Sequence, residues 1–180
     1  SPSAGSLMTF GLPGSGGMHI TDWEADHIHT TNTLTLGGNQ TERIEFNGLS
    51  YADRASRVNV LALKELGGNI TFHGEPTTFV QPVYMVVRDS VDMLTNVTVD
   101  GHVDIIADAW CEDQGTPGTL TLSTGSHLVS TNSLIEVTTR GVVLNGIINA
   151  GSDNIMFTTC NRNSMGIGGT GSGDGLVNFA

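Results

Sequence analysis

Acidic side chains gather between residues 89 and 113, where their oxygen atoms could bind a hard cation. If this stretch forms strands that stack about 4.8 Å apart, neighbouring carboxylates repel one another. A divalent cation with oxygen ligands would relieve that repulsion. The alternative is an acidic face that keeps the protein soluble, and the sequence contains no EF-hand pattern. We therefore predict a calcium site whose candidate ligands are Asp100, Asp104, Asp108 and Asp113.

Two histidines near the N-terminus form a second candidate metal site. His27 and His29 follow acidic residues at positions 22, 24 and 26. On an extended strand the two imidazoles would face the same side, where they could share a transition metal with a carboxylate. A solvated polar bend accounts for the same residues without a metal, because the spacing supplies no third fixed ligand.

A catalytic use of the carboxylates would need an acid and a base close together. Asp104 and Asp108 are the residues that would form such a pair in a polysaccharide-degrading enzyme. These enzymes also bring cations together to hold an acidic sugar, whereas Lys64 stands alone and Arg140 is remote in sequence. No GxSxG, P-loop or HExxH motif occurs. We therefore predict no catalytic or cofactor-binding residues and no required cofactor.

The overall charge argues against two classes of partner. Asp and Glu number 18 against 7 Lys and Arg, which gives a formal net charge of −11. Non-specific nucleic-acid binding depends on a basic surface, and so does docking on an anionic membrane. No segment reaches the roughly eighteen apolar residues that cross a bilayer. We expect neither a nucleic-acid partner nor membrane insertion.

The elements that must position these residues are short strands. Apolar and polar residues alternate with period two over runs of four to six residues, and similar runs return roughly every twenty residues. This pattern predicts an all-β protein and favours a β-solenoid of roughly 20-residue coils, with a β-sandwich or jelly roll as the alternative. One capping box, at residues 21–24, predicts a short helix or bend. The expected core residues are Leu63, Ile70, Val86, Ile105, Leu122, Ile135, Leu144 and Ile155.

A longer repeat links the two ends of the chain. Residues 6–16 return in nearly the same pattern as residues 163–173, and residues 18–21 are answered by residues 177–180. That spacing of roughly 160 residues indicates one unit of a tandem array plus an overlap. We therefore expect a Gly/Ser-rich spacer with a short bend at 1–32, a β-block at 33–162, and at 163–180 the start of a further spacer that repeats 6–21.

Two chemical modifications stay open from the sequence. Cys111 and Cys160 are either one disulfide or two separate thiols, and coils of about twenty residues would place them two turns apart. That is too far for a bridge unless the chain bends. Sequons begin at Asn39, Asn69 and Asn96, and these asparagines are candidates either for glycosylation or for ladders between stacked strands.

Residues 60–63 (VLAL) with 67–74 (GGNITFHG) resemble the "LTL…GGNITFNG" units of filamentous-haemagglutinin-like surface proteins. Residues 142–159 do so as well. Residues 14–25 and 165–180 are similar to the spacer segments of giant β-strand-repeat surface proteins of Gram-negative bacteria. The resemblance implies a right-handed parallel β-helix that is secreted or held at the cell surface. His19, Trp23, His27 and His29 depart from the spacer pattern.

The expected function is therefore structural. We predict a repeat unit of an extracellular or cell-surface protein that associates with itself, end to end, into a filament, a layer or a giant adhesin. A solenoid without polar caps exposes strand edges that recruit partners. One alternative is an adhesin module that binds glycans, and another is a β-helix polysaccharide-degrading enzyme. Calcium is the metal that the acidic residues favour.

Overall fold

The computed structural model describes residues 6–12, 17–52, 55–64, 67–111 and 118–160, together with the backbone of 166–167 and 176–179. It is an all-β protein with three parallel sheets and one short helix, α1 (Asp22–Ala25). Sheet A contains β1 (Ser6–Gly11), β2 (Met18–Ile20), β4 (Thr41–Asn47), β7 (Asn69–Phe72), β10 (Val91–Met93), β13 (Thr119–Leu122), β16 (Gly141–Leu144), β19 (Gly166–Ile167) and β20 (Leu176–Phe179). Sheet B contains β3 (Thr33–Gly38), β6 (Arg57–Ala62), β9 (Val83–Val87), β12 (Val103–Ala107), β15 (Ile135–Thr139) and β18 (Ile155–Thr159). Sheet C contains β5 (Ser50–Tyr51), β8 (Thr77–Phe79), β11 (Val97–Val99), β14 (His127–Ser130) and β17 (Ile147–Asn149).

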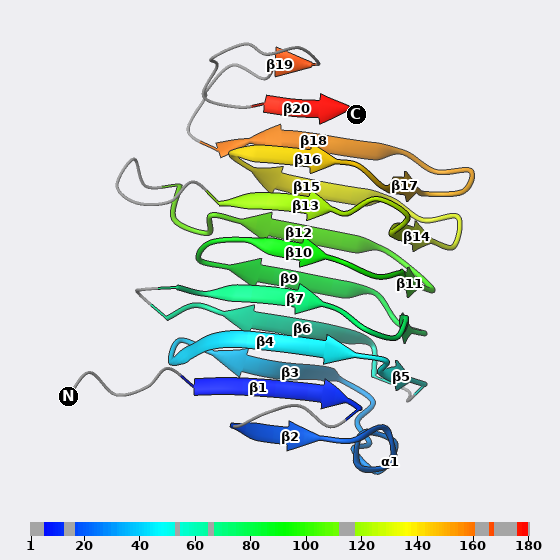
Figure 1. The fold of residues 1–180 in the computed structure, drawn as a ribbon. Coiled ribbons are helices and arrows are strands. Elements are labelled where there is room, and N and C mark those ends of the chain that lie inside the picture. The colour runs from blue at the N-terminus through cyan, green and yellow to red at the C-terminus, as the bar shows by residue number, and fades with distance from the viewer. Residues whose placement is uncertain are drawn as a thin grey trace, which may run out of the picture.

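From β3 to β18 the chain visits the sheets in a fixed order, B, then A, then C. Neighbouring strands in a sheet are therefore three strands apart in the chain, and they stack as Figure 1 shows. We call each set of three successive strands a three-strand repeat. Every strand pair in the described residues is parallel. The alternative of a β-sandwich or jelly roll, which antiparallel strands build, is excluded for this part of the chain.

The shortest three-strand repeats are twenty residues long, as the sequence predicted. Val83 pairs with Val103, and Ile135 pairs with Ile155. Other repeats are longer because insertions lengthen their corners, and the pair Val103–Ile135 spans 32 residues for this reason. The recurrence in the sequence therefore gives the basic length, while the insertions decide which residues become neighbours.

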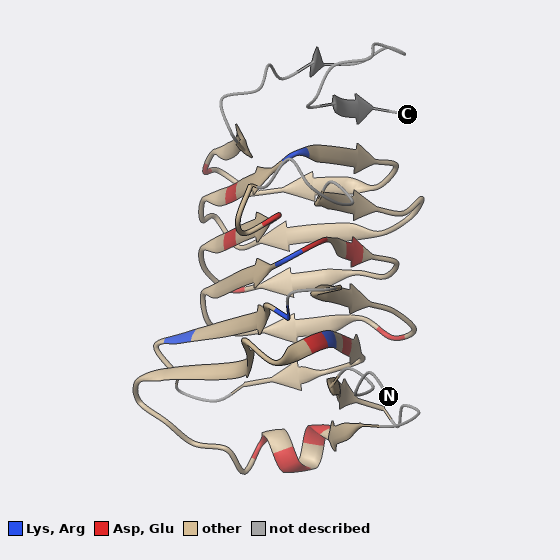
Figure 2. Cartoon of the chain, turned by 90° about the vertical axis from the view of Figure 1, so that its left-hand side faces the viewer, with Lys and Arg blue, Asp and Glu red and all other residues tan. Residues whose placement is uncertain are grey.

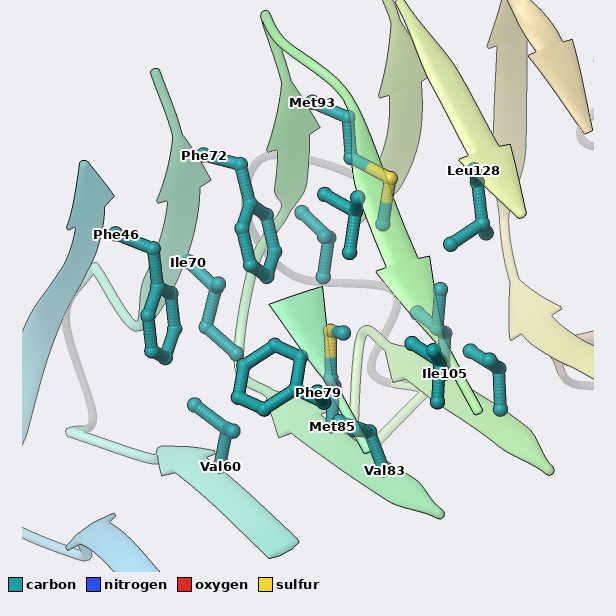
Figure 3. Close-up of a cluster of buried hydrophobic side chains, with 14 of the residues drawn as sticks. Phe46, Val60, Ile70, Phe72, Phe79, Val83, Met85, Met93, Ile105 and Leu128 are labelled. Atoms are coloured by element: carbon teal, nitrogen blue, oxygen red, sulfur yellow. The ribbon is translucent and has the colours of Figure 1, made fainter. Parts of the chain in front are cut away.

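Alternation with period two fills the space between the sheets with apolar side chains. In sheet A, Phe10, Phe46 and Phe72 occupy one column, with ring centroids 5.1 and 4.8 Å apart along the stack. Phe79 of sheet C meets Phe46 edge to face at 5.7 Å. Such aromatic pairs add to the stabilisation from burial alone. Figure 3 shows the rings of Phe46, Phe72 and Phe79 beside Met85 and aliphatic side chains from the three sheets.

Most of the predicted core residues are buried, and three are not. Ile70, Ile105, Leu122 and Ile135 are fully buried and Leu144 is 8% exposed. The predictions for Leu63, Val86 and Ile155 are wrong. Leu63 follows the end of β6 at a corner, and Val86 lies between the inward residues Met85 and Val87 of β9, so it faces outward. Ile155 occupies an inward column but belongs to the last strand of sheet B, and it is 40% exposed.

The segments expected to be spacers contribute strands. Residues 6–11 and 18–20 form β1 and β2, which continue sheet A past β4. At the other end, β20 continues the same sheet past β16. The sequence pattern missed these strands because their Gly-rich surroundings indicate loops. The predicted capping box at residues 21–24 is confirmed as the start of α1.

Asparagine side chains connect successive three-strand repeats. Asn69 Oδ1 accepts a hydrogen bond from the Ser90 N–H at 3.0 Å, and Asn96 Oδ1 accepts one from His127 N–H at 2.9 Å. The acceptor and donor thus lie on neighbouring repeats, so two of the three sequon asparagines brace the stack. Glycosylation of these residues stays a prediction. Asn47 and Asn132 make equivalent bonds to the Glu75 and Ser152 N–H groups.

Candidate functional site

The predicted histidine ligands lie just after helix α1 rather than on a strand. The helix ends at Ala25, so His27 falls in the turn that follows. Its Nδ1 lies 2.6 Å from the Trp23 carbonyl oxygen, and its ring lies 4.3 Å from the Trp23 ring. His27 and His29 are both exposed. The alternation of a strand, which would have placed the two imidazoles on one side, does not apply to them.

The predicted calcium ligands are distributed along the chain between β11 and the corner after β12. Asp100 is exposed in the turn between these strands, and Asp104 lies on the outer face of β12. Asp108 is buried at the corner, where its Oδ2 lies 3.0 Å from Arg140 Nε. Asp113 lies outside the described residues. In the part of the chain that the structure describes, no three His, Cys, Asp or Glu side chains gather as a metal site would require.

The outer face of sheet B brings together two carboxylates that are remote in sequence. Asp104 of β12 pairs in register with Glu136 of β15. Glu136 Oε2 lies 3.1 Å from His102 Nε2, and the Arg57 guanidinium lies 5.4 Å from the centre of the Tyr84 ring on the neighbouring strand. Figure 2 shows acidic residues recurring along the length of the stack. This face therefore carries an acid, a cation and an aromatic ring within one ladder.

Burial and charge shift the pKa of several side chains on this face and the next. Burial raises the pKa of Asp104, and the neighbouring Glu136 carboxylate raises it further, although His102 and Arg57 partly offset this. Burial also raises the pKa of Asp92 in sheet A, against a hydrogen bond from Thr121. Carboxyl groups with raised pKa values hold their protons at higher pH than ordinary ones.

The acid/base pair considered from the sequence, Asp104 with Asp108, is not formed. Asp108 lies past the end of β12 and pairs with Arg140, whereas the carboxylate opposite Asp104 is that of Glu136. Sequence spacing gave no signal for Glu136, because the insertion after β12 shifts the register between the two strands to 32 residues. Only the strand pairing identifies this neighbour.

The insertion between β12 and β13 carries a disulfide that the sequence left open. Cys111 of this insertion is bonded to Cys160, which directly follows β18. The two corners lie two strand spacings apart in sheet B, yet the Cα atoms are 5.3 Å apart. The described start of the insertion, residues 108–111, therefore reaches along the stack to the corner after β18, which meets the condition under which the sequence allowed a bridge. Arg88 packs over the Trp110 ring at 4.1 Å beside this bridge.

The N-terminal end of the stack is covered by helix α1 and the segment after it. Ala25 is 3% exposed and lines, with Phe10, Leu36 and Ile28, a residual cavity of about 10 Å³. Asp22 Oδ1 accepts a hydrogen bond from the Ser50 N–H at 3.1 Å, on the outermost strand of sheet C. The Tyr51 hydroxyl donates to the Ile28 carbonyl at 3.2 Å. The helix thus covers apolar side chains and satisfies the edge of β5.

The C-terminal end has no equivalent cover over sheets B and C in the described residues. These sheets end at β18 and β17. Ile155, which lies in an inward column, is 40% exposed. Met156 and Ile147 face outward and are 45% and 55% exposed. Exposed apolar side chains that are contiguous with a core mark an interaction site. Met18 and Trp23, on β2 and α1, are likewise exposed at the opposite end. The two ends are therefore the candidate functional site.

Sheet A has the same pair of strands at both ends. At the N-terminal end the order is β4, β1, β2, and at the C-terminal end it is β16, β20, β19. Met8 of β1 pairs with Met18 of β2, and Ile167 of β19 pairs with Val177 of β20. In each of the two pairs the residues are ten positions apart in the chain. The long sequence repeat aligns β2 with β20. Strand order and sequence therefore agree on β2 and β20. For β19 they differ by two residues, because the repeat aligns residue 167 with Phe10 and the pairing places it in the column of Met8.

Comparison with protein-family models, with curated proteins and with solved structures found no match for this chain. Among the described residues, no helix is long and apolar enough to cross a membrane. Functional inference therefore depends on the architecture of the stack and its two ends.

Proposed function

We propose that the chain is a right-handed parallel β-helix that serves as a structural repeat unit of a secreted or cell-surface protein. Units join end to end into an extracellular filament, layer or giant adhesin. The fixed order of sheets and the parallel pairing support a β-helix. The right-handed path follows the strong preference of parallel crossover connections for that hand. The likeness to filamentous-haemagglutinin-like proteins supports the same assignment.

The observation that carries the proposal is the repeated strand pair in sheet A. A strand pair equivalent to β1 and β2 extends the sheet beyond β16. A repeat protein stacks each unit on the next because one unit cannot bury its end alone. At that end Ile155 is the exposed residue of an inward column that stacking would cover, whereas Ile147 and Met156 lie in the outward columns of His127 and Glu136.

The disulfide supports an extracellular location. Disulfides persist in oxidising compartments and are rare in the reducing cytosol. Closing a loop of 49 residues contributes about 4 kcal/mol in the chain-entropy account. A protein exposed outside the cell benefits from such a bridge at the end of the stack that lacks a helical cover.

Self-association tests the proposal. Negative-stain electron microscopy of the purified chain over a range of concentrations should show filaments or sheets that lengthen as concentration rises. Fibre diffraction should give a repeat of about 4.8 Å along the long axis, since the strands stack in that direction. Monomers at every concentration, with the fold intact by circular dichroism, would overturn end-to-end assembly.

The exposed carboxylates would bind calcium in addition to, and not as a requirement for, the end-to-end contacts. Titration calorimetry with CaCl₂ should report binding, and EDTA should weaken the filaments. Asp100→Asn tests the exposed carboxylate between β11 and β12. Filaments that are indifferent to EDTA, together with an absence of heat on titration, would remove calcium from the proposal.

Glycan binding by an adhesin is a second candidate, favoured by the outer face of sheet B. Tyr84 provides an aromatic surface, and Asp104 and Glu136 provide hydrogen-bond acceptors beside it. A glycan array should then report ligands for the wild-type chain that Tyr84→Ala loses. The same two carboxylates would be the acid/base pair of a polysaccharide-degrading enzyme, for which release of reducing sugar is the assay.

A further inference from the structure

Helix α1 and β2 lie at the N-terminal end of the stack, opposite the end at which sheets B and C have no cover in the described residues. At the N-terminal end, the chain runs from β2 into α1, and the helix then covers the edge of sheet C through Asp22 and Ala25. At the C-terminal end, β20 occupies the position beside β16, and the outermost strand of sheet C, β17, has no such cover in the described residues. The cover and the uncovered end thus belong to opposite ends of one unit.

The strand orders at the two ends are continuous with each other. If β20 is equivalent to β2 and β19 to β1, the order β16, β20, β19 continues directly into β4 of a following unit. The register agrees, because Met18 and Ile20 lie in the columns of Met8 and Phe10, while residues 177 and 179 lie in the columns of Val142 and Leu144. A single sheet A would therefore run through the junction without interruption.

From this continuity, and resting on the proposed function, we propose that β19 and β20 occupy the place of β1 and β2 of the next unit. The partner of the C-terminal end is the N-terminal end of a second copy of this chain. Its β2 pairs with β16, and its helix α1 lies over β17 and covers the inward residues Ile148 and Ile155. The exposed Trp23 and Met18 of the second copy face this end.

In separate chains, β19 and β20 occupy the edge of β16 that a second copy would use. A second copy can dock its own β2 on β16 only after β20 and β19 have left that edge. The fraction of chains with a vacant edge limits the apparent affinity, because apparent affinity falls with the population of the competent state. The strand pair β19–β20 is thus an internal competitor of assembly, and weakening it should promote assembly.

The test uses the full chain with the double substitution Val177→Pro/Asn178→Pro. Proline removes a backbone N–H and is not tolerated inside a sheet. Consecutive residues of a strand direct their N–H groups to opposite neighbours, so one of the two prolines faces β16. Val177→Ala/Asn178→Ala keeps both N–H groups and is the matched control. Sedimentation velocity over a concentration series measures the midpoint of self-association for each protein.

The midpoint of the proline variant should fall by about 10- to 1,000-fold, because minor states are typically populated at about 0.1–10%. The alanine control should stay near wild type. In a second measurement, a synthetic peptide of residues 161–180 added to the proline variant should return it to the monomer, and a scrambled peptide should not. If the proline variant proves unfolded by circular dichroism, the peptide is added to the wild-type chain instead and should slow its assembly.

The outcomes separate this proposal from the proposed function. If wild type and the proline variant assemble with the same midpoint, end-to-end assembly is retained, and the proposed competition of β19–β20 for the edge of β16 is overturned. Weaker assembly of the proline variant would also overturn this competition and retain end-to-end assembly, because it would show that β19–β20 contributes to the interface. Monomers in all three proteins would overturn both proposals.

Discussion

The two ends of the stack bury the same kind of side chain to different extents. Leu36, in the first strand of sheet B, is 6% exposed, whereas Ile155, in the last strand of that sheet, is 40% exposed. Both are apolar residues on strands that alternate, so their own sequence context does not explain the difference. Helix α1 and its following segment close the N-terminal end, where they line a cavity with Leu36. Figure 1 shows this helix at one end of the stack.

Each end of the stack is stabilised in its own way. The N-terminal end has a packed apolar cover and two hydrogen bonds to sheet C, one from Ser50 to Asp22 of α1 and one from Tyr51 to Ile28 after the helix. The C-terminal end has a covalent bond from Cys160 to a loop two strands further down sheet B. A cover protects against water, whereas a disulfide restrains the chain and leaves apolar surface exposed. The C-terminal end therefore leaves more apolar surface exposed than the N-terminal end.

Removing a phenylalanine should cost far more near the covered end than at the open end. Phe46→Ala deletes a fully buried ring that contacts three other rings and should lower the free energy of unfolding by about 3–5 kcal/mol. Phe157→Ala deletes an inward ring that is only partly buried, and less than half of that loss is expected. Urea denaturation measures both. Equal losses would contradict the comparison of the ends.

Breaking the disulfide should loosen the C-terminal end selectively. Cys111→Ser/Cys160→Ser should lower the free energy of unfolding by about 4 kcal/mol. Hydrogen exchange should then increase in β15 and β18 and remain unchanged in β3 and β4, which lie at the other end of their sheets. Reduction of the wild-type chain with dithiothreitol is the matched control. Uniform loss of protection along the whole stack would show that the bridge restrains more than this end.

Removing the helix cap should loosen the N-terminal end by a smaller amount. In Thr21→Ala the Glu24 N–H loses its acceptor, at 3.2 Å in the wild type, and the capping box is lost. The expected cost is about 1 kcal/mol. Thr21→Ser keeps the hydroxyl and should lie near wild type. Thermal unfolding measures the loss, and exposure of Tyr51 to solvent, followed by its fluorescence, should rise in the alanine variant alone.

The protonation state of Asp104, in the middle of the stack, should change the free energy of unfolding by a small amount. Burial and the Glu136 carboxylate raise the pKa of Asp104 in the folded protein. Its contribution therefore favours folding below the unfolded pKa of about 3.9, and that contribution is lost as pH rises through the folded pKa. Asp104→Asn should raise the free energy of unfolding near pH 7 by about 0.2–1 kcal/mol, the size of a cross-strand charge effect.

The pH dependence of that variant supplies its control. Below the unfolded pKa the wild-type carboxyl is already neutral, so Asp104→Asn should give no gain in urea denaturation at about pH 3.5. The conservative variant Asp104→Glu keeps the charge and should show no gain at either pH. A gain of equal size at both pH values would mean that the substitution acts through packing rather than through charge.

The amino-acid sequence by itself determined the local features of this protein. Alternation with period two predicted short strands that recur roughly every twenty residues, and it assigned inward positions such as Ile70 and Ile105 correctly. The capping box located α1, and the long repeat identified β2 and β20 as equivalent. These features are local because the face of a residue depends on its immediate neighbours in the chain. The short strands of sheet C, two to four residues long, gave weaker patterns and were largely missed.

The tertiary structure decided which residues meet across the stack. Glu136 faces Asp104 because an insertion after β12 lengthens that repeat to 32 residues. Cys111, at the start of the same insertion, is bonded to Cys160. The neighbour above a residue depends on the sum of all corner lengths in between, which no local pattern contains. Burial at the ends is decided in the same way. Ile155 lies in the correct column, and its exposure follows from the absence of a covering strand in the described part of sheet B.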